Sequence, residues 1–107
     1  MSAKPETNFR RRVVAFLHSL EPKIYYTSVQ QKSISGTPDI LACIRGNFTA
    51  IEIKARGGKL TPLQAYAIQR IIDADGVAVE CNPDNFEIFK KLITELNDDS
   101  EIKQKHN

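Results

Sequence analysis

The sequence lacks the features that mark membrane-spanning, secreted or disulfide-built proteins. No apolar run approaches the ~20 residues that a helix needs to cross a bilayer, and the arginine-rich start is followed by no apolar stretch of a secretory signal. The only two cysteines, Cys43 and Cys81, form neither a C-x-x-C zinc pattern nor a disulfide framework. These absences favour a cytoplasmic protein with no membrane partner and no organic cofactor.

Carboxylates are scarce in the first part of the chain. Residues 1–60 hold ten of the 15 basic residues and only four of the 13 acidic ones, although the formal net charge is only +2. Such an electropositive half favours a polyanionic partner, nucleic acid first among them. The alternative is a solvated basic face without a ligand.

The length and periodicity predict one α/β domain. A chain of 107 residues with 41% hydrophobic residues suits a single core. Helical and strand periodicities predict the order α-β-β-β-α-β-α, with a mixed β-sheet flanked by helices. The predicted elements are a helix over 5–20, strands over 24–29, 39–45 and 48–55, a helix over 62–74, a strand over 77–81 and a helix ending near 96. Residues 1–96 then form the domain, and 97–107 form a flexible tail.

A predicted hairpin gathers three ionisable residues. If Gly46-Asn47 is a two-residue turn, Asp39 lies opposite Lys54, and Leu41 lies opposite Glu52. Because strand side chains alternate between faces, Asp39, Glu52 and Lys54 share one side of the sheet.

Two interpretations of this trio are open. The first is a cross-strand ion pair between Asp39 and Lys54, which is common and weak. It accounts poorly for Glu52 in mid-strand, because a buried charge without partners is costly. The second is a divalent cation held by the carboxylates of Asp39 and Glu52, since Mg²⁺ prefers oxygen ligands.

The residues around this trio resemble a known nuclease family. Pro38-Asp39 followed by Glu52-Ile53-Lys54 resembles the PD-(D/E)-x-K signature. With the segments 36–40 (G-T-P-D-I) and 60–64 (L-T-P-L-Q), the pattern is similar to the VRR-NUC (virus-type replication–repair nuclease) branch in its stand-alone form. The resemblance covers residues 5–96 and implies a restriction-endonuclease-like core.

The resemblance implies a role for each matching residue. Asp39, Glu52 and the backbone carbonyl of Ile53 would bind Mg²⁺, for which Mn²⁺ would substitute. Lys54 would be the catalytic lysine, able to steady a water or charge on phosphorus.

Two further residues have both structural and catalytic interpretations. Thr61, Pro62 and Gln64 are typical of a capped helix start, with Gln64 at the capping-box position. The resemblance also places Gln64 at the edge of the active site. It further implies an acidic residue on the first helix, for which Glu6 fits better than Glu21. The structural alternative is that Glu6 only stabilises the first turn of that helix through the helix dipole.

Basic residues near these motifs are candidates for DNA binding. Contacts to phosphate position a nucleic acid without reading its sequence. The alternative is that these basic residues only form a solvated surface. The candidates are Arg56, Lys59, Arg10, Arg11 and Arg12.

The sequence therefore predicts a metal-dependent DNA endonuclease. We expect selection of branched, Holliday-junction-like DNA by a homodimer, in a prokaryotic cell or a phage-infected host. A flap or single-strand nuclease of the same fold and a non-catalytic nucleic-acid-binding module are the alternatives.

Overall fold

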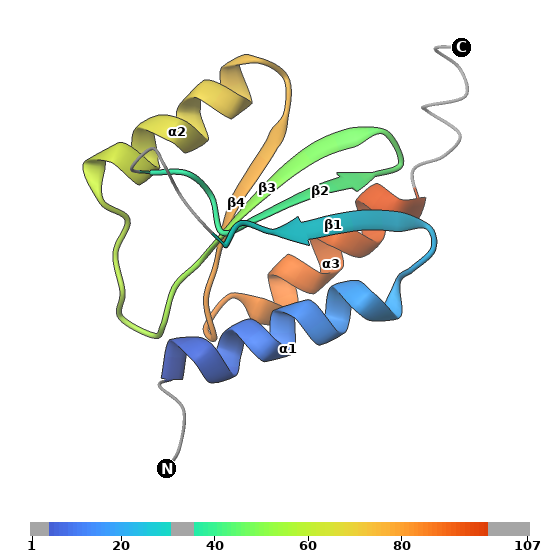
Figure 1. Cartoon of the computed structure of the whole chain (residues 1–107), viewed down its shortest axis with the longest axis horizontal. Coiled ribbons are helices and arrows are strands. Elements are labelled where there is room, and N and C mark those ends of the chain that lie inside the picture. Colours follow the sequence, from blue (N-terminus) through green and yellow to red (C-terminus); the bar gives the residue numbers. More distant parts are fainter. Residues whose placement is uncertain (1–4, 31–35, 99–107) are drawn as a thin grey trace.

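A computed structural model describes residues 5–30 and 36–98 of the chain. The elements follow the order predicted from the sequence (Figure 1). They are α1 (Pro5–Ser19), β1 (Ile24–Ser28), β2 (Ile40–Ile44), β3 (Asn47–Ile53), α2 (Pro62–Asp73), β4 (Val77–Cys81) and α3 (Phe86–Asp98).

The four strands form one mixed sheet in the order β1-β2-β3-β4. β1, β2 and β3 pair antiparallel, and β4 pairs parallel to β3. The β3-α2-β4 segment is therefore the predicted crossover connection, which a parallel pair requires. The coarse prediction of an α/β domain with a mixed sheet flanked by helices is confirmed.

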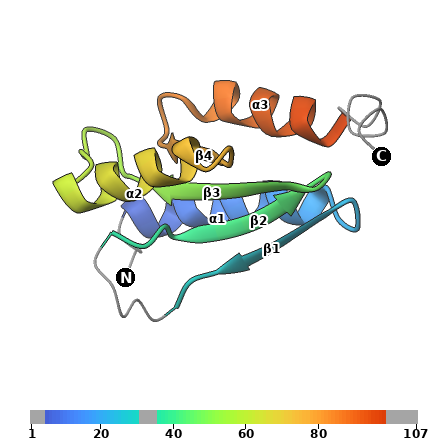
Figure 2. The ribbon, with the colours of Figure 1, turned by 90° about the horizontal axis from the view of Figure 1, so that it is seen from above.

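α1 and α3 cover one face of the sheet, and α2 lies on the other side (Figures 1 and 2). The helical stripe of α1 buries Phe9, Val13 and Leu17. The rings of Phe9 and Phe86 meet edge to face, with centroids 5.1 Å apart. The main core is completed by Ile24, Ile40, Ala42, Ile44, Ile51, Ile53, Cys81, Phe89 and Ile93.

The second face of the sheet is only partly covered. α2 contacts β4 and buries none of its own residues fully. Beyond α2, the side chains of Tyr25 and Phe48 are 70% and 49% exposed, and Cys43, which pairs with both in the strand register, is also exposed. Among residues 5–30 and 36–98, no helix covers this face of the sheet over β1 and β2 (Figure 2).

The predicted register of the β2–β3 hairpin is wrong by two residues. Ile44 pairs with Asn47, so the turn consists of Arg45 and Gly46 and not of Gly46 and Asn47. Arg45 and Gly46 have φ angles of 52° and 84°. Two successive positive φ angles are typical of a type I′ turn, which favours glycine at its second position.

The end of the last helix also differs from the prediction. α3 runs to Asp98 with Asn97 buried, so the helix extends two residues past the predicted domain end at Leu96. Arg45 donates a hydrogen bond from Nε to the carbonyl oxygen of Asn97, which satisfies an acceptor near the helix end. Residues 99–107 of the predicted tail lie outside the described part of the chain.

Cys81 is not placed as a nucleophile. Burial raises the pKa of the Cys81 thiol to about 12, so this side chain acts as a small core residue.

No helix in the described residues is long and apolar enough to cross a membrane.

Candidate active site

The corrected register brings Asp39 level with Glu52. Ile40 pairs with Ile51 at the end of the ladder, so Asp39 and Glu52 are the next residues along the two chain segments. A shift of two residues leaves every side chain on its predicted face, because the alternation has a period of two. Directly opposed positions hold their Cβ atoms about 4.5–5.5 Å apart. This register places the two residues closer together than the predicted register would.

The hairpin ladder ends before Pro38, since Ile40 and Ile51 are its last pair. Beyond that pair, the N–H of Ile53 donates to Oδ2 of Asp39 at 2.8 Å. Pro38 has no N–H of its own to add to the ladder. A backbone donor thus holds the carboxylate that follows the proline of the motif.

Asp39 is also held by a residue of α1. Nη2 of Arg10 lies 3.1 Å from Oδ1 of Asp39, in an ion pair whose aspartate side chain is only 8% exposed. The predicted ion-pair partner of Asp39 was Lys54. Arg10, which was predicted to contact DNA, takes that position.

Glu52 is buried and is held by α2. The whole residue is 3% exposed, and its Oε2 accepts a hydrogen bond from Nε2 of Gln64 at 3.0 Å. Oε1 of the same Gln64 accepts from the N–H of Thr61 at 2.8 Å, while the Thr61 hydroxyl accepts from the N–H of Gln64 at 3.1 Å. The capping box is confirmed, and it uses only the amide oxygen of Gln64. Its amide nitrogen remains available for the carboxylate.

Gly36 explains why the G-T-P-D and L-T-P-L-Q segments occur together. Gly36 has a φ of +90°, and a Cβ atom there would lie 2.6 Å from the carbonyl oxygen of Leu63. The turn before Asp39 therefore packs directly against the first turn of α2, which only glycine permits. This contact ties the segment that carries Asp39 to the helix that carries Gln64.

Lys54 lies beside the two carboxylates. Its N–H continues the parallel ladder by donating to the carbonyl of Cys81 at 2.9 Å, so the strand alternation puts its side chain on the face of Glu52. The side chain is half-buried. Within residues 5–30 and 36–98, the Lys54 ammonium has no hydrogen-bond or ion-pair partner.

Glu80 is a neighbour that the sequence did not identify. β4 pairs Glu80 with Glu52 in register, so a third carboxylate, half-buried, continues the row across the sheet. Its carbonyl accepts a hydrogen bond from Nδ2 of Asn85. The prediction of a parallel β3–β4 step contained the only signal for this residue.

Asp39 and Glu52 suit a hard divalent cation by their chemistry. They offer carboxylate oxygens on adjacent strands, fixed by Ile53, Arg10 and Gln64, and Mg²⁺ is commonly held by one or two carboxylates with water and substrate oxygens. The described residues contain no group of three or more histidine, cysteine, aspartate or glutamate side chains arranged to hold a metal. A site here would thus depend on two carboxylates and backbone or solvent oxygens.

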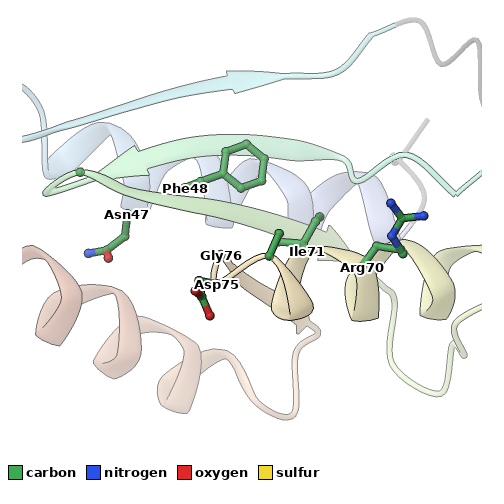
Figure 3. A pocket seen from close by; sticks show the side chains of 8 residues that line it. Asn47, Phe48, Arg70, Ile71, Asp75 and Gly76 are labelled. Atoms are coloured by element: carbon green, nitrogen blue, oxygen red, sulfur yellow. The ribbon is translucent and has the colours of Figure 1, made fainter.

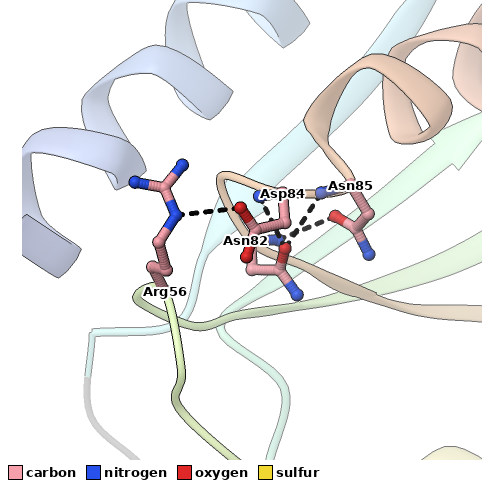
Figure 4. A network of polar contacts seen from close by, with 4 residues as sticks. All are labelled: Arg56, Asn82, Asp84 and Asn85. Atoms are coloured by element: carbon pink, nitrogen blue, oxygen red, sulfur yellow. Dashed lines mark hydrogen bonds and ion pairs between the residues drawn. The ribbon is translucent and has the colours of Figure 1, made fainter.

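The other predicted DNA-binding residues are more dispersed. Arg56 is 69% exposed and pairs with Asp84 at 2.8 Å, before the turn that starts α3 (Figure 4). Lys59 and Arg11 are exposed. The Arg12 guanidinium lies over the ring of Phe86, 4.9 Å from its centroid. The side chain of Glu6 lies outside the described part of the structure.

Two surface hollows formed by described residues lie away from the carboxylates. The larger, of about 510 Å³, separates the β2–β3 turn from the end of α2 and is lined by Phe48, Arg70 and Gly76 among others (Figure 3). The smaller lies between Pro38 and Tyr66. None of the predicted site residues lines either of these hollows.

Comparisons with protein-family models, with curated proteins and with solved structures find no match to this chain. The functional argument therefore depends on the geometry of the site and on the motifs.

The contact between Gln64 and Glu52 can be tested separately from its capping role. Gln64→Glu keeps an oxygen for the cap but removes the donor to Glu52 and adds a negative charge. We expect the free energy of unfolding to fall by about 1–3 kcal/mol at pH 7. The loss should shrink toward pH 4, because like-charge repulsion raises the carboxyl pKa values in the folded state, and protonation removes the repulsion.

Urea unfolding of both proteins at each pH provides the measurement. Gln69→Glu is the matched control, since Gln69 makes a similar contact with Asp73 at 2.8 Å on the exposed side of α2. This control should change stability by less than about 0.5 kcal/mol. Equal stability of wild type and Gln64→Glu at pH 7 would contradict the contact.

Proposed function

We propose that this protein is a metal-dependent endonuclease that hydrolyses phosphodiester bonds in DNA. The observation that carries the proposal is the pair of buried carboxylates, Asp39 and Glu52, level with each other on adjacent strands and beside Lys54. Two buried carboxylates at one place are costly unless cations compensate them. A divalent cation with a phosphate substrate suits them, and so does the excess of basic residues in residues 1–60.

Asp39, Glu52 and the carbonyl of Ile53 would hold the ion in this proposal. The N–H and C=O groups of one strand residue point to the same edge, and the Ile53 N–H points to Asp39. The carbonyl of Ile53 is therefore directed toward the same side, where Pro38 has no N–H to donate. When bound, Mg²⁺ supplies Lewis acidity to the phosphate and lowers the pKa of a coordinated water.

The remaining residues would position the reacting groups. Lys54 can orient a water or stabilise charge that develops on the phosphoryl oxygens, because its ammonium is not engaged elsewhere among the described residues. Gln64 fixes the Glu52 carboxylate. Arg56 and Lys59, on the exposed loop after β3, would contact backbone phosphates. The exposed Arg56–Asp84 pair is weak enough for a phosphate to replace it.

The finer fold assignment belongs to the same proposal. The order α-β-β-β-α-β-α, with the carboxylates on a hairpin and a crossover helix behind it, is consistent with a restriction-endonuclease-like core of the VRR-NUC type. Branched, junction-like DNA is the proposed substrate, because one small domain offers little surface for reading bases. A flap or single-strand nuclease and a non-catalytic DNA-binding module remain the alternatives.

The catalytic role of Lys54 is tested by Lys54→Ala. We expect wild type to cut four-way junctions with Mg²⁺ and not with EDTA. The variant should lose at least about 100-fold in cleavage rate and keep its DNA affinity within about threefold, because phosphate contacts elsewhere dominate binding. Single-turnover cleavage and a binding titration on junction, flap and linear DNA measure both quantities.

Lys91→Ala, an exposed lysine on α3, is the matched control and should cleave as wild type does. Undiminished cleavage by Lys54→Ala would remove Lys54 from the mechanism. Binding without cleavage by wild type, whichever divalent metal is added, would favour the non-catalytic module. If wild type cut flap or single-stranded DNA in preference to junctions, the alternative of a flap or single-strand nuclease would be favoured.

We also propose that two copies associate through the uncovered face of the sheet. The exposed side chains of Tyr25, Cys43 and Phe48 lie in one row there and carry no charge, which suits a protein surface better than a polyanion. A twofold axis through this face would present two carboxylate sites to a symmetric substrate.

Light scattering tests this association. Wild type should have twice the 12.1 kDa mass of one chain, and Tyr25→Glu should return it to the single-chain mass, because a charge would be buried at the contact. Ile88→Glu is the control, since Ile88 is 72% exposed on α3 and should not affect the dimer. A single-chain mass for wild type, or a dimer that persists in Tyr25→Glu, would contradict this arrangement.

A further inference from the structure

The Arg10–Asp39 ion pair lies at the proposed metal site but has no part in the proposed chemistry. Arg10 reaches Oδ1 of Asp39 from α1, across 29 positions of sequence. Its side chain is 32% exposed, whereas the adjacent Arg11 belongs to the exposed surface. Arg10 and Arg11 carry the same charge, so the contact with Asp39 is what distinguishes Arg10 from its neighbour.

The contact satisfies a requirement of the folded protein when no other cation is present. Asp39 is 6% exposed, and an ionised carboxylate at that burial needs a counter-charge. The Ile53 N–H at Oδ2 supplies a dipole but no full charge. Arg10 supplies a full positive charge at Oδ1.

A guanidinium at Oδ1 and a divalent cation on the same carboxylate are mutually unfavourable. Both are positive, and two like charges a few ångströms apart repel strongly where water is partly excluded. Both also need the carboxylate's oxygens, which offer a limited set of lone pairs.

We propose that Arg10 is an internal counter-ion that occupies Asp39 in the ion-free protein and competes with the divalent cation for it. Arg10 is thus a positioning residue that keeps the Asp39 carboxylate ordered, and it limits the affinity of the site. This inference rests on the proposed function, since it concerns the ion that Asp39 and Glu52 would hold. It adds a cost to metal binding that the carboxylates alone do not predict.

The competition is tested by titrating free Mn²⁺ with the full chain, followed by electron paramagnetic resonance. Arg10→Gln removes the positive charge and keeps an amide that can donate to Asp39. We expect its Mn²⁺ affinity to rise about tenfold over wild type. Arg11→Gln, with the same change in net charge, should stay within about twofold, and Arg10→Lys, which keeps the charge, should stay within about threefold.

Thermal unfolding gives a second readout that needs no catalytic activity. In EDTA, Arg10→Gln should unfold at a lower temperature than wild type, because Asp39 has lost its counter-charge. Saturating Mn²⁺ should then raise the unfolding temperature more in Arg10→Gln than in wild type, since tighter binding stabilises the folded state more. Arg11→Gln should respond to Mn²⁺ as wild type does.

The outcomes separate the two proposals. The competition would be overturned if Arg10→Gln bound Mn²⁺ as weakly as wild type or more weakly. If Asp39→Asn and Glu52→Gln also abolished the Mn²⁺ binding seen in wild type, the metal site itself would still be supported. Binding that survives Asp39→Asn and Glu52→Gln, or no binding by any form including Arg10→Gln, would overturn both the competition and the metal site.

Discussion

Two negative charges buried on neighbouring strands are the constraint on which the rest of this structure depends. Asp39 and Glu52 are 6% and 3% exposed and lie level with each other in the β2–β3 hairpin. Removing an ion from water costs several kcal/mol even after the protein relaxes. Arg10 and the Ile53 N–H offset that cost at Asp39, and Gln64 does so at Glu52. Because these partners come from α1, β3 and α2, the carboxylates connect both sides of the sheet.

The structural and catalytic interpretations of the motif residues are compatible with each other. Gln64 caps α2 with its amide oxygen and contacts Glu52 with its amide nitrogen. Gly36 allows its turn to pack against the first turn of that helix, where a Cβ atom would clash. Each residue helps to form a precise carboxylate pair, and precision of this kind is what metal-assisted chemistry needs.

Signals from residues close in sequence predicted the helices and strands. Contacts between residues distant in sequence determined the features that these signals did not predict. The cap at Thr61 and the strand alternation around Glu52 depend on near neighbours, and both predictions held. The hairpin register failed because glycine suits either position of a two-residue turn, and only pairing selects Arg45-Gly46. No turn fixes the register of a parallel pair, so Glu80 was not foreseen. The Arg10–Asp39 contact joins residues far apart in sequence, which no periodicity reveals.

Crystals of the wild-type protein grown with Mn²⁺ would test the central claim most directly, through anomalous scattering at the manganese absorption edge. The account predicts one strong anomalous peak in contact with carboxylate oxygens of both Asp39 and Glu52, with the Arg10 guanidinium withdrawn from Oδ1 of Asp39. A map from crystals in saturating Mn²⁺ that shows no peak between the two carboxylates, with Arg10 still paired to Asp39, would contradict it. The buried charges would then serve the fold alone.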